Sequence, residues 1–386
     1  MNFIFLSPHF PPNYYQFAVW LKTLGVNVLG VADEHYDNLR PELKSALTEY
    51  YRVRDMHNYD DLVRALGYFT HRYGKLDRLD SHNEYWLETE ARLRTDFNIP
   101  GVKTDQIDRI KRKSRMKEAF VEAGIKVPRG GVVRDMDEAM AVIQQVGYPL
   151  VAKPDIGVGA AATYKIHDVN ELRSFFESKP PVDYMLEEFV DGQIITYDGL
   201  TDRYGVPVFT NAMVYSAGIM ETVLDDDLIF YYTLRDIPAD LDAAGRRVLE
   251  AFGVRERFFH FEFFRPKDGG GLTALEVNMR PPGGLTTDMF NYACDIDIYH
   301  AWASIVAGRE FPYPGYTHKY YCCYASRKSN RAYAHSEQEI LAKFGDKFRH
   351  REAISGVFSR ALGDQGFIFR TTELEEVARI ARFIQE

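Results

Sequence analysis

The chain has 386 residues, of which 46% are hydrophobic, and its formal net charge is −9. This composition predicts two or three packed domains and excludes a disordered or fibrous chain. The negative charge argues against general attraction to nucleic acid or to an anionic membrane. There is no apolar run of about 18 residues, no basic-then-apolar leader and no metal-binding spacing among the three cysteines, so we expect a reducing, cytoplasmic setting.

Strand and helix patterns alternate through the N-terminal part of the chain. We predict strands at 3–6, 26–31 and 76–79 and helices at 14–24, 60–72 and 86–97. This alternation indicates a parallel, Rossmann-like sheet. The turn after the first strand reads SPHFPPNYY rather than GxGxxG, so dinucleotide binding is not supported.

A basic stretch, RIKRKSRMK at 109–117, opens the next part on an expected helix that ends at Gly124. A solvent-exposed face is the ordinary interpretation for most of its six basic side chains. A second α/β segment follows, with strands near 132 and 164 and at 148–153 and 185–189, and helices at 136–146 and 169–177.

The remainder is rich in strands as far as residue 308, with expected helices at 241–252 and 299–306. The tail predicts a strand at 320–326, a helix at 337–344 and a last helix after residue 371.

Three polar residues alternate with apolar ones in ALEVNMRPPGG, residues 274–284. Side chains alternate between the faces of a strand, so Glu276, Asn278 and Arg280 share one face. An exposed strand face with a Glu–Arg pair is the ordinary alternative.

A second strand, FFHFEFF at 258–264, holds a carboxylate among aromatic residues, where an unpaired charge would be costly. The turn RPKDGGG joins the two strands as a hairpin. If Phe264 faces Ala274, then Glu262 faces Glu276. Two adjacent carboxylates repel unless a cation lies between them. Glu262, Glu276 and Asn278 supply the oxygen ligands that Mg²⁺ prefers, so we predict a magnesium site.

Magnesium of this kind implies a nucleotide, and YPLVAKPDIGVGAAATYKI, residues 148–166, offers a phosphate cradle. Lys153 ends an apolar strand, and Gly157 and Gly159 follow in a small-residue loop. Small residues let backbone N–H groups approach phosphate oxygens closely, and lysine adds a point charge. A common Gly/Ala hairpin is the alternative for this motif alone.

Together these motifs resemble the ATP-grasp superfamily over about residues 110–308. The resemblance rests on KSRMKEAFVEAGIKVP, the Lys153 loop, MLEEFVDG at 185–192 and the two strands described above, all in the family's order. It implies an α/β fold in which two α+β lobes clamp ATP, preceded by a Rossmann-like domain.

The resemblance assigns roles residue by residue. Phosphate-binding lysines would be Lys113 and Lys153, with Gly157 and Gly159 in the lid loop. Adenine would lie against the hinge, mainly at backbone groups of Glu188 and Val190, among the residues Glu187, Glu188, Phe189 and Val190. Metal ligands for Mg²⁺, or Mn²⁺ in its place, would be Glu262, Glu276 and Asn278, and Arg280 would stabilise the transition state.

Two departures from the family pattern affect these expectations. Many members carry a glutamate shortly after the hinge glycine, where this chain has Gln193 and Ile194, so the contacts to the ribose are expected to differ. The lid loop VGAAAT has fewer glycines than many relatives and is expected to be stiffer.

The resemblance implies a single ATP-grasp unit divided as 1–108, 109–312 and 313–386, with a lid lobe at about 125–190 and a metal-binding lobe at about 191–312. It implies that a carboxylate is activated as an acylphosphate and joined to an amine, with release of ADP and phosphate. His260 and Arg327 are candidate substrate contacts, beside the alternatives of a core histidine and a surface arginine. Small acids and amines are the expected partners, and a homodimer fits this class.

Other functions remain open at this point. A carboxylase-like or purine-pathway enzyme of the same superfamily is one alternative, and a catalytically silent nucleotide-binding regulator is another. A nucleic-acid binder is disfavoured by the acidic total and by the lack of aromatic residues among the basic ones.

Overall fold

The computed structural model describes all residues except 158–161, 219–221, 223–225, 268, 355 and 357–358. Its N-terminal domain is a four-stranded parallel sheet in the order β3-β2-β1-β4. The strands are β1 (Asn2–Leu6), β2 (Asn27–Ala32), β3 (Glu49–Arg52) and β4 (Arg78–Asp80), and the helices are α1 (Tyr15–Thr23), α2 (Pro41–Ala46), α3 (Tyr59–Tyr73) and α4 (Leu87–Asp96). The predicted parallel sheet is therefore confirmed, whereas α2 and β3 were not predicted.

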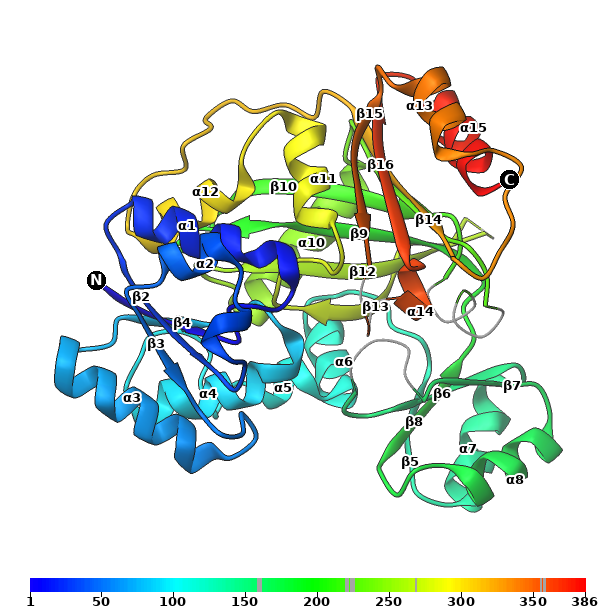
Figure 1. Cartoon of the computed structure of the whole chain (residues 1–386). Helices are drawn as coiled ribbons and strands as arrows, with labels where there is room; N and C mark the ends of the chain where they lie inside the picture. The colour runs from blue at the N-terminus through cyan, green and yellow to red at the C-terminus, as the bar shows by residue number, and fades with distance from the viewer. Residues whose placement is uncertain (158–161, 219–221, 223–225, 268, 355, 357–358) are drawn as a thin grey trace.

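A second, smaller sheet projects from the rest of the molecule (Figure 1). Its order is β5-β8-β6-β7, and α7 and α8 pack on it through their own hydrophobic core. We call residues 130–188 the lid lobe; its elements are β5 (Gly130–Val133), α7 (Met136–Val146), β6 (Leu150–Pro154), β7 (Tyr164–Ile166), α8 (Val169–Ser178) and β8 (Tyr184–Glu188). The prediction of a second α/β segment here is correct element by element.

An eight-stranded sheet forms the body, in the order β13-β12-β9-β10-β11-β14-β16-β15. Its strands are β9 (Gly192–Thr201), β10 (Pro207–Tyr215), β11 (Phe230–Thr233), β12 (Phe258–Pro266), β13 (Thr273–Asn278), β14 (Tyr321–Arg327), β15 (Phe348–Ala353) and β16 (Gln365–Thr371). The helices of this part are α10 (Ala239–Phe252), α11 (Thr286–Cys294), α12 (Ile298–Val306), α13 (Glu337–Phe344), α14 (Ser359–Leu362) and α15 (Leu374–Gln385). The C-terminal tail thus continues the same sheet, while the three-part division of the chain stays a prediction.

Strand alternation on β12 decides which side chains reach the site. Phe259, Phe261 and Phe263 are fully buried against Tyr197 and the helices α6 (Lys113–Glu122) and α10. The alternate residues of the strand face the other side of the sheet. Close packing of α10 requires Gly245, because a Cβ there would lie 2.1 Å from a ring carbon of Tyr197.

The basic stretch forms two helices rather than the single predicted one. α5 (Asp108–Lys111) and α6 (Lys113–Glu122) are separated at Arg112, whose backbone is extended. Asp155 holds the start of α6, since its carbonyl accepts from Lys113 N–H and its carboxylate from Ser114 N–H, both at 2.8 Å. The loop after β6 therefore fixes the helix that carries Lys113.

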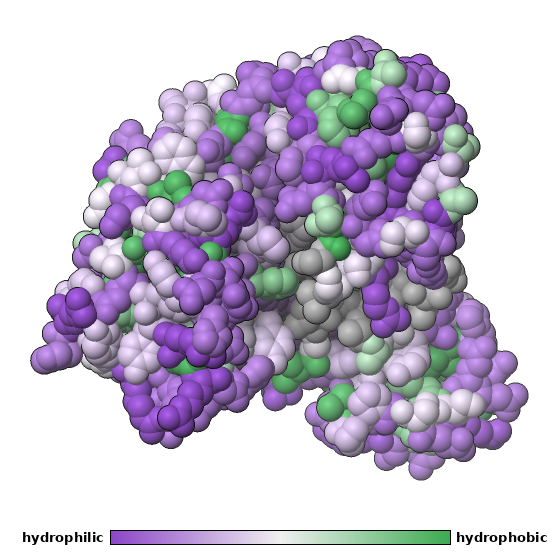
Figure 2. All heavy atoms as spheres, in the orientation of Figure 1, coloured by the Kyte–Doolittle hydropathy of each residue, from purple (hydrophilic) through white to green (hydrophobic). Residues whose placement is uncertain are grey.

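The surface seen in Figure 2 is mostly hydrophilic and is indented between the lid lobe and the N-terminal domain. Hydrophobic residues on this face are scattered among polar ones. None of the described helices is long and apolar enough to cross a membrane.

Candidate functional site

The hairpin of β12 and β13 brings the two predicted carboxylates together. Glu262 lies directly opposite Glu276, which confirms the expected pairing. Phe264, however, lies opposite Thr273 rather than Ala274, because the register shifts by one residue directly after Glu262. A bulge of this kind leaves one residue unpaired and re-aims the side chains beside it.

Each carboxylate already has a cationic partner. Glu276 accepts from Nζ of Lys113 at 2.6 Å, and Glu262 lies 3.1 Å from Nε2 of His260. The Asn278 amide also donates to Glu262, at 3.2 Å. Lys113, His260 and Asn278 are all buried, so these polar groups meet away from bulk water.

Burial is the main reason why the pKa of Glu276 lies above its usual value. Lys113 lowers this pKa, and the neighbouring carboxylates of Glu84 and Glu262 raise it further. Burial alone would raise the pKa of Glu262 too, but the hydrogen bond and charge of His260 hold it below its usual value. The raised pKa of Glu276 shows that Lys113 does not fully offset its burial and the neighbouring carboxylates, so a further cation beside it would be favourable.

Arg280 is held by a residue that the sequence reasoning did not single out. Its Nη2 and Nε lie 3.0 and 3.3 Å from the Glu84 carboxylate, and Nη2 also donates to Oδ1 of Asn278 at 3.4 Å. Glu84 begins a short 3₁₀ helix, η3 (Glu84–Trp86), that follows β4 in the N-terminal domain. The only sequence signal was its position, since side chains beyond the carboxyl end of a parallel strand commonly line a site.

His260 has a second buried partner, Asp198 of β9. Nδ1 of His260 lies 2.5 Å from Oδ1 of Asp198, and Oδ2 of Asp198 accepts from the Thr196 hydroxyl at 2.6 Å. Burial alone would lower the pKa of His260, but Asp198 and Glu262 raise it to about 9. The ring is therefore a buried cation that links Asp198 to Glu262, and the core-histidine alternative describes its packing better than a free substrate contact.

A second cluster lies under the lid lobe. Glu187 of β8 is 2.5 Å from Nζ of Lys153 and is also paired with Lys117. Burial alone would raise the pKa of Glu187, but the two lysines hold it below its usual value. The exposed-face interpretation was wrong for Lys111 and Lys117, because these side chains are mostly or fully buried against carboxylates.

The helix α6 connects the two clusters. Lys113 and Lys117 are four residues apart and lie on the same face, one turn from each other. One lysine reaches the paired glutamates of the body and the other reaches Glu187 of the lid lobe. The ammonium groups of Lys113 and Lys117 therefore lie between β13 and β8, an arrangement that suits a linear polyanion such as a nucleoside triphosphate.

The hinge residues Glu188, Phe189 and Val190 differ in the contacts that they make. The Glu188 carboxylate is held by Arg129 at 2.6 and 2.8 Å, and its backbone N–H donates to the Arg129 carbonyl. This N–H is therefore not available to adenine. The ring of Phe189 lies 3.7 Å from Nζ of Lys165, and Val190 is half-buried just beyond β8.

The remaining candidates contribute less to the geometry. Gly157 is not required sterically, since a Cβ there would make only an ordinary contact at 3.5 Å with Pro154. Gly159 lies outside the described residues. The Arg327 guanidinium donates to the backbone carbonyls of Ile384 and His335, at 2.5 and 2.8 Å, so it ties the tail together instead of facing the paired glutamates.

The side chains of the hairpin have the oxygen atoms that a magnesium-bound nucleotide requires of its protein ligands. Within the described part of the chain no three His, Cys, Asp or Glu side chains are placed to hold a metal ion, and the candidate ligands at the hairpin are two carboxylates and one amide. Asn278 presents Nδ2 to Glu262 and Oδ1 to Arg280, so it becomes a ligand only after its amide turns round. Two carboxylates and an amide still leave positions for water and phosphate, as Mg²⁺ prefers.

Sequence comparison relates the chain to carbamoyl phosphate synthases. It is 28% identical over 227 residues to the C-terminal section of a large chain from Methanopyrus kandleri, which covers 55% of this chain and 40% of that relative. It is 25% identical over 281 residues to a large chain from Gemmatimonas aurantiaca, which covers 69% of this chain and 23% of that one. The chain therefore spans less than half the length of these relatives. No family model matches the sequence.

Solved structures share the fold over nearly the whole chain. An L-amino acid ligase from Bacillus licheniformis superposes with a TM-score of 0.76 at 14% identity, covering 100% of this chain and 96% of the other. An N5-carboxyaminoimidazole synthetase from Staphylococcus aureus, complexed with ADP, gives 0.72 at 14% identity, covering 98% and 95%. The biotin carboxylase domain of a Hydrogenobacter thermophilus 2-oxoglutarate carboxylase, with MgADP and bicarbonate, gives 0.69 at 17% identity, covering 98% and 88%.

Proposed function

We propose that the chain is an ATP-grasp enzyme, an ATP-dependent ligase that joins a carboxylate to an amine and releases ADP and phosphate; its similarity to carbamoyl phosphate synthases and the fold that it shares with the L-amino acid ligase support this. The observation that carries the proposal is the meeting of Glu262, Glu276, Asn278 and Arg280 on one largely buried face, with Lys113 beside it and Lys117, one turn further along α6, beside Glu187 and Lys153. A nucleotide-binding regulator has no need of Arg280 beside two paired carboxylates.

In this proposal Mg²⁺, or Mn²⁺ in its place, supplies charge neutralisation for the triphosphate when bound to Glu262, Glu276 and Asn278. Lys113 and Lys153 would then exchange their carboxylate partners for phosphate oxygens. Adenine would lie at the hinge around Phe189 and Val190.

Arg280 would act on the reacting groups. A substrate carboxylate oxygen would attack the γ-phosphorus, breaking its bond to the β-γ bridging oxygen and releasing ADP. The amine would then attack the acyl carbon, and phosphate would leave with the former carboxylate oxygen. Arg280 would stabilise the negative charge on the transferred group, and Glu84 would hold the guanidinium in place for it.

An amide or dipeptide bond is the product that we favour, because the L-amino acid ligase superposes with a TM-score of 0.76, higher than the 0.72 and 0.69 of the carboxyaminoimidazole synthetase with ADP and the biotin carboxylase domain. The fold shared with the carboxyaminoimidazole synthetase and the biotin carboxylase domain keeps bicarbonate as the second candidate acid. The proposal includes a small carboxylic acid and a small amine as substrates, and a homodimer as the assembly.

A substrate screen tests the function. The protein with ATP and Mg²⁺ would be incubated with a panel of amino acids and with bicarbonate, and ADP and phosphate would be measured. We expect release that needs one acid and rises with one amine, and mass spectrometry identifies the product. Arg280→Met is the matched negative control. Turnover with bicarbonate alone would favour the second candidate, and nucleotide binding without turnover across the panel would favour the regulator.

A further inference from the structure

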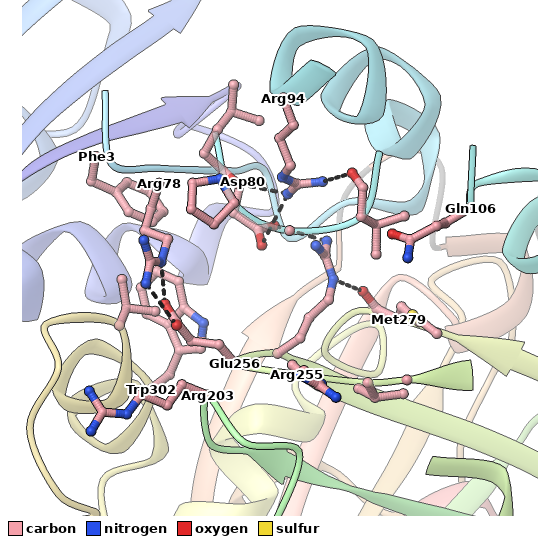
Figure 3. Close-up of a pocket in the computed structure, with 18 residues that line it drawn as sticks. Phe3, Arg78, Asp80, Arg94, Gln106, Arg203, Arg255, Glu256, Met279 and Trp302 are labelled. Atoms are coloured by element: carbon pink, nitrogen blue, oxygen red, sulfur yellow. Dashed lines mark hydrogen bonds and ion pairs between the residues drawn. The ribbon is translucent and has the colours of Figure 1, made fainter. Parts of the chain in front are cut away.

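A cavity of about 510 Å³ lies between the N-terminal domain and the body, away from the paired glutamates (Figure 3). It is bounded by the end of β4, α4 and the loop after it on one side. The turn between β9 and β10, the segment between α10 and β12, and α12 bound the other side. None of the candidate site residues lines it, so it is separate from the proposed nucleotide site.

Two arginines beside the cavity, Arg94 and Arg257, are balanced by two acids, Asp80 and Glu90. Arg257 lies 3.4 Å from Asp80 and 3.2 Å from Glu90, and Arg94 lies 2.8 Å from Glu90. These two arginines and two acids are all buried.

A further arginine of the wall is balanced as well. Arg78 makes a bidentate pair with Glu256, with contacts of 2.5 and 3.0 Å. The acidic groups of the cavity are thus already matched by Arg78, Arg94 and Arg257.

Two more arginines leave a surplus of positive charge. Arg203 and Arg255 line the same cavity, are exposed, and form no ion pair with any described residue. Figure 3 shows them on the opposite side of the cavity from Arg94 and Asp80. Such a concave surface with two unmatched guanidinium groups attracts a small anion with two negative charges.

A buried donor on the wall also lacks an acceptor. Arg94 is only 1% exposed, and its Nε is buried without a hydrogen-bond partner among the described residues. The neighbouring position is Gly101, where a Cβ would come within 2.9 Å of this nitrogen. Gly101 therefore packs directly on this nitrogen, and both residues line the cavity. Buried donors are normally satisfied, so this wall carries one donor that no described residue uses.

We propose that this cavity is a binding site for a small organic dianion, of the chemistry shared by phosphate monoesters and dicarboxylates, independent of the nucleotide site. Its volume suits a metabolite of that size. The site also touches the reaction centre indirectly, since Nε of Arg257 donates to the carbonyl of Met279 at 2.7 Å, between Asn278 and Arg280.

Calorimetric titration of the full chain tests the proposal, with inorganic phosphate, ribose 5-phosphate and succinate as probes in 0.15 M salt, near physiological ionic strength. We expect saturable binding of at least one probe. If phosphate and ribose 5-phosphate bind but succinate does not, the ligand is a phosphoryl compound. If only succinate binds, the ligand is a dicarboxylate.

Variants assign the binding to the cavity. Arg203→Ser with Arg255→Ser should weaken binding at least about tenfold, because two charge-assisted contacts are lost. Both residues are exposed, so the fold should tolerate the change. Arg54→Ser with Arg173→Ser removes two exposed arginines elsewhere and should leave binding unchanged, as should Lys153→Met in the nucleotide site. Absence of binding for every probe, binding retained in the Arg203/Arg255 variant, or binding lost with Lys153→Met would each overturn the proposal.

Discussion

The charge of Glu187 should stabilise the lid lobe, and Glu187→Gln tests this. The carboxylate is 3% exposed and is the shared partner of Lys153 and Lys117. Removing one member of a buried pair typically costs about 3–5 kcal/mol, because the remaining charge is left uncompensated. We expect the opening free energy of β6 and β8 to fall by about 3 kcal/mol, which speeds hydrogen exchange of their amides by about 100-fold.

A neighbouring glutamate supplies the matched control. Glu188 pairs with Arg129, whose side chain is 63% exposed, so Glu188→Gln should cost only about 0–1 kcal/mol. Native-state hydrogen exchange, followed by mass spectrometry of peptides that cover Tyr184–Glu188, measures the exchange rates of these amides in both variants. Equal effects of the two substitutions would refute the assignment of a buried charge cluster.

The pH dependence of the same contribution follows from the lowered pKa of Glu187. Burial would raise this pKa, but Lys153 and Lys117 keep it below the usual 4.5 in the folded state. The stabilisation is therefore present above about pH 4.5 and is lost as the pH falls through the folded pKa. In Glu187→Gln this acid-dependent loss should be absent.

Three more outcomes are expected from the site and its surroundings. ATP with Mg²⁺ should raise Tm more than ATP with EDTA, and Glu276→Gln should remove that difference; equal shifts in the unmodified protein would exclude the metal site. Arg280→Lys keeps the charge but loses the planar fork, so turnover should fall far more than ATP affinity, and a pure loss of affinity would contradict its role. Burial lowers the pKa of His82 to about 4 from the ordinary 6.5, so the unfolded chain binds the proton first and stability rises with pH between these values. His82→Gln should flatten this rise by up to about 1.4 kcal/mol per pH unit in urea unfolding, and an unchanged slope would exclude the buried neutral ring.

The hairpin was predictable because local rules fix it. Alternation put the polar residues of β12 and β13 on one face, and the turn joined the two strands as a hairpin, although Glu262 lies opposite Glu276 only because the register shifts directly after Glu262. The bulge after Glu262 was not predictable in the same way, since it depends on how the strands pack on their neighbours. The lid lobe was read correctly for the same reason, as its strands and helices are short and bounded by turn residues.

The partners of the site residues come from distant segments, and this is why they were missed. Glu84 reaches Arg280 across 196 positions of the sequence. Asp198 reaches His260 through the pairing of β9 with β12, which no local pattern specifies. Lys117 looked like part of an exposed basic face, because nothing nearby in the sequence indicates that Glu187 lies over it.

The tail strand at 320–326 was predicted and is β14, whereas the other two tail strands, β15 and β16, were hidden by their composition. β15 reads FRHREA, an edge strand whose polar residues resemble a loop. Charged side chains are typical of edge strands, where they discourage further pairing. β16 is buried between β14 and β15 and gives a short apolar run that periodicity alone does not classify.

The most direct test of the proposed ligase chemistry follows one oxygen atom. The acid identified by the substrate screen would be labelled with ¹⁸O in its carboxylate and turned over with ATP, Mg²⁺ and the amine. Because a carboxylate oxygen attacks the γ-phosphorus and leaves with it, the released phosphate should carry one ¹⁸O atom, and ADP should be unlabelled. Label in AMP with release of pyrophosphate, or unlabelled phosphate from a completed turnover, would contradict the acylphosphate route.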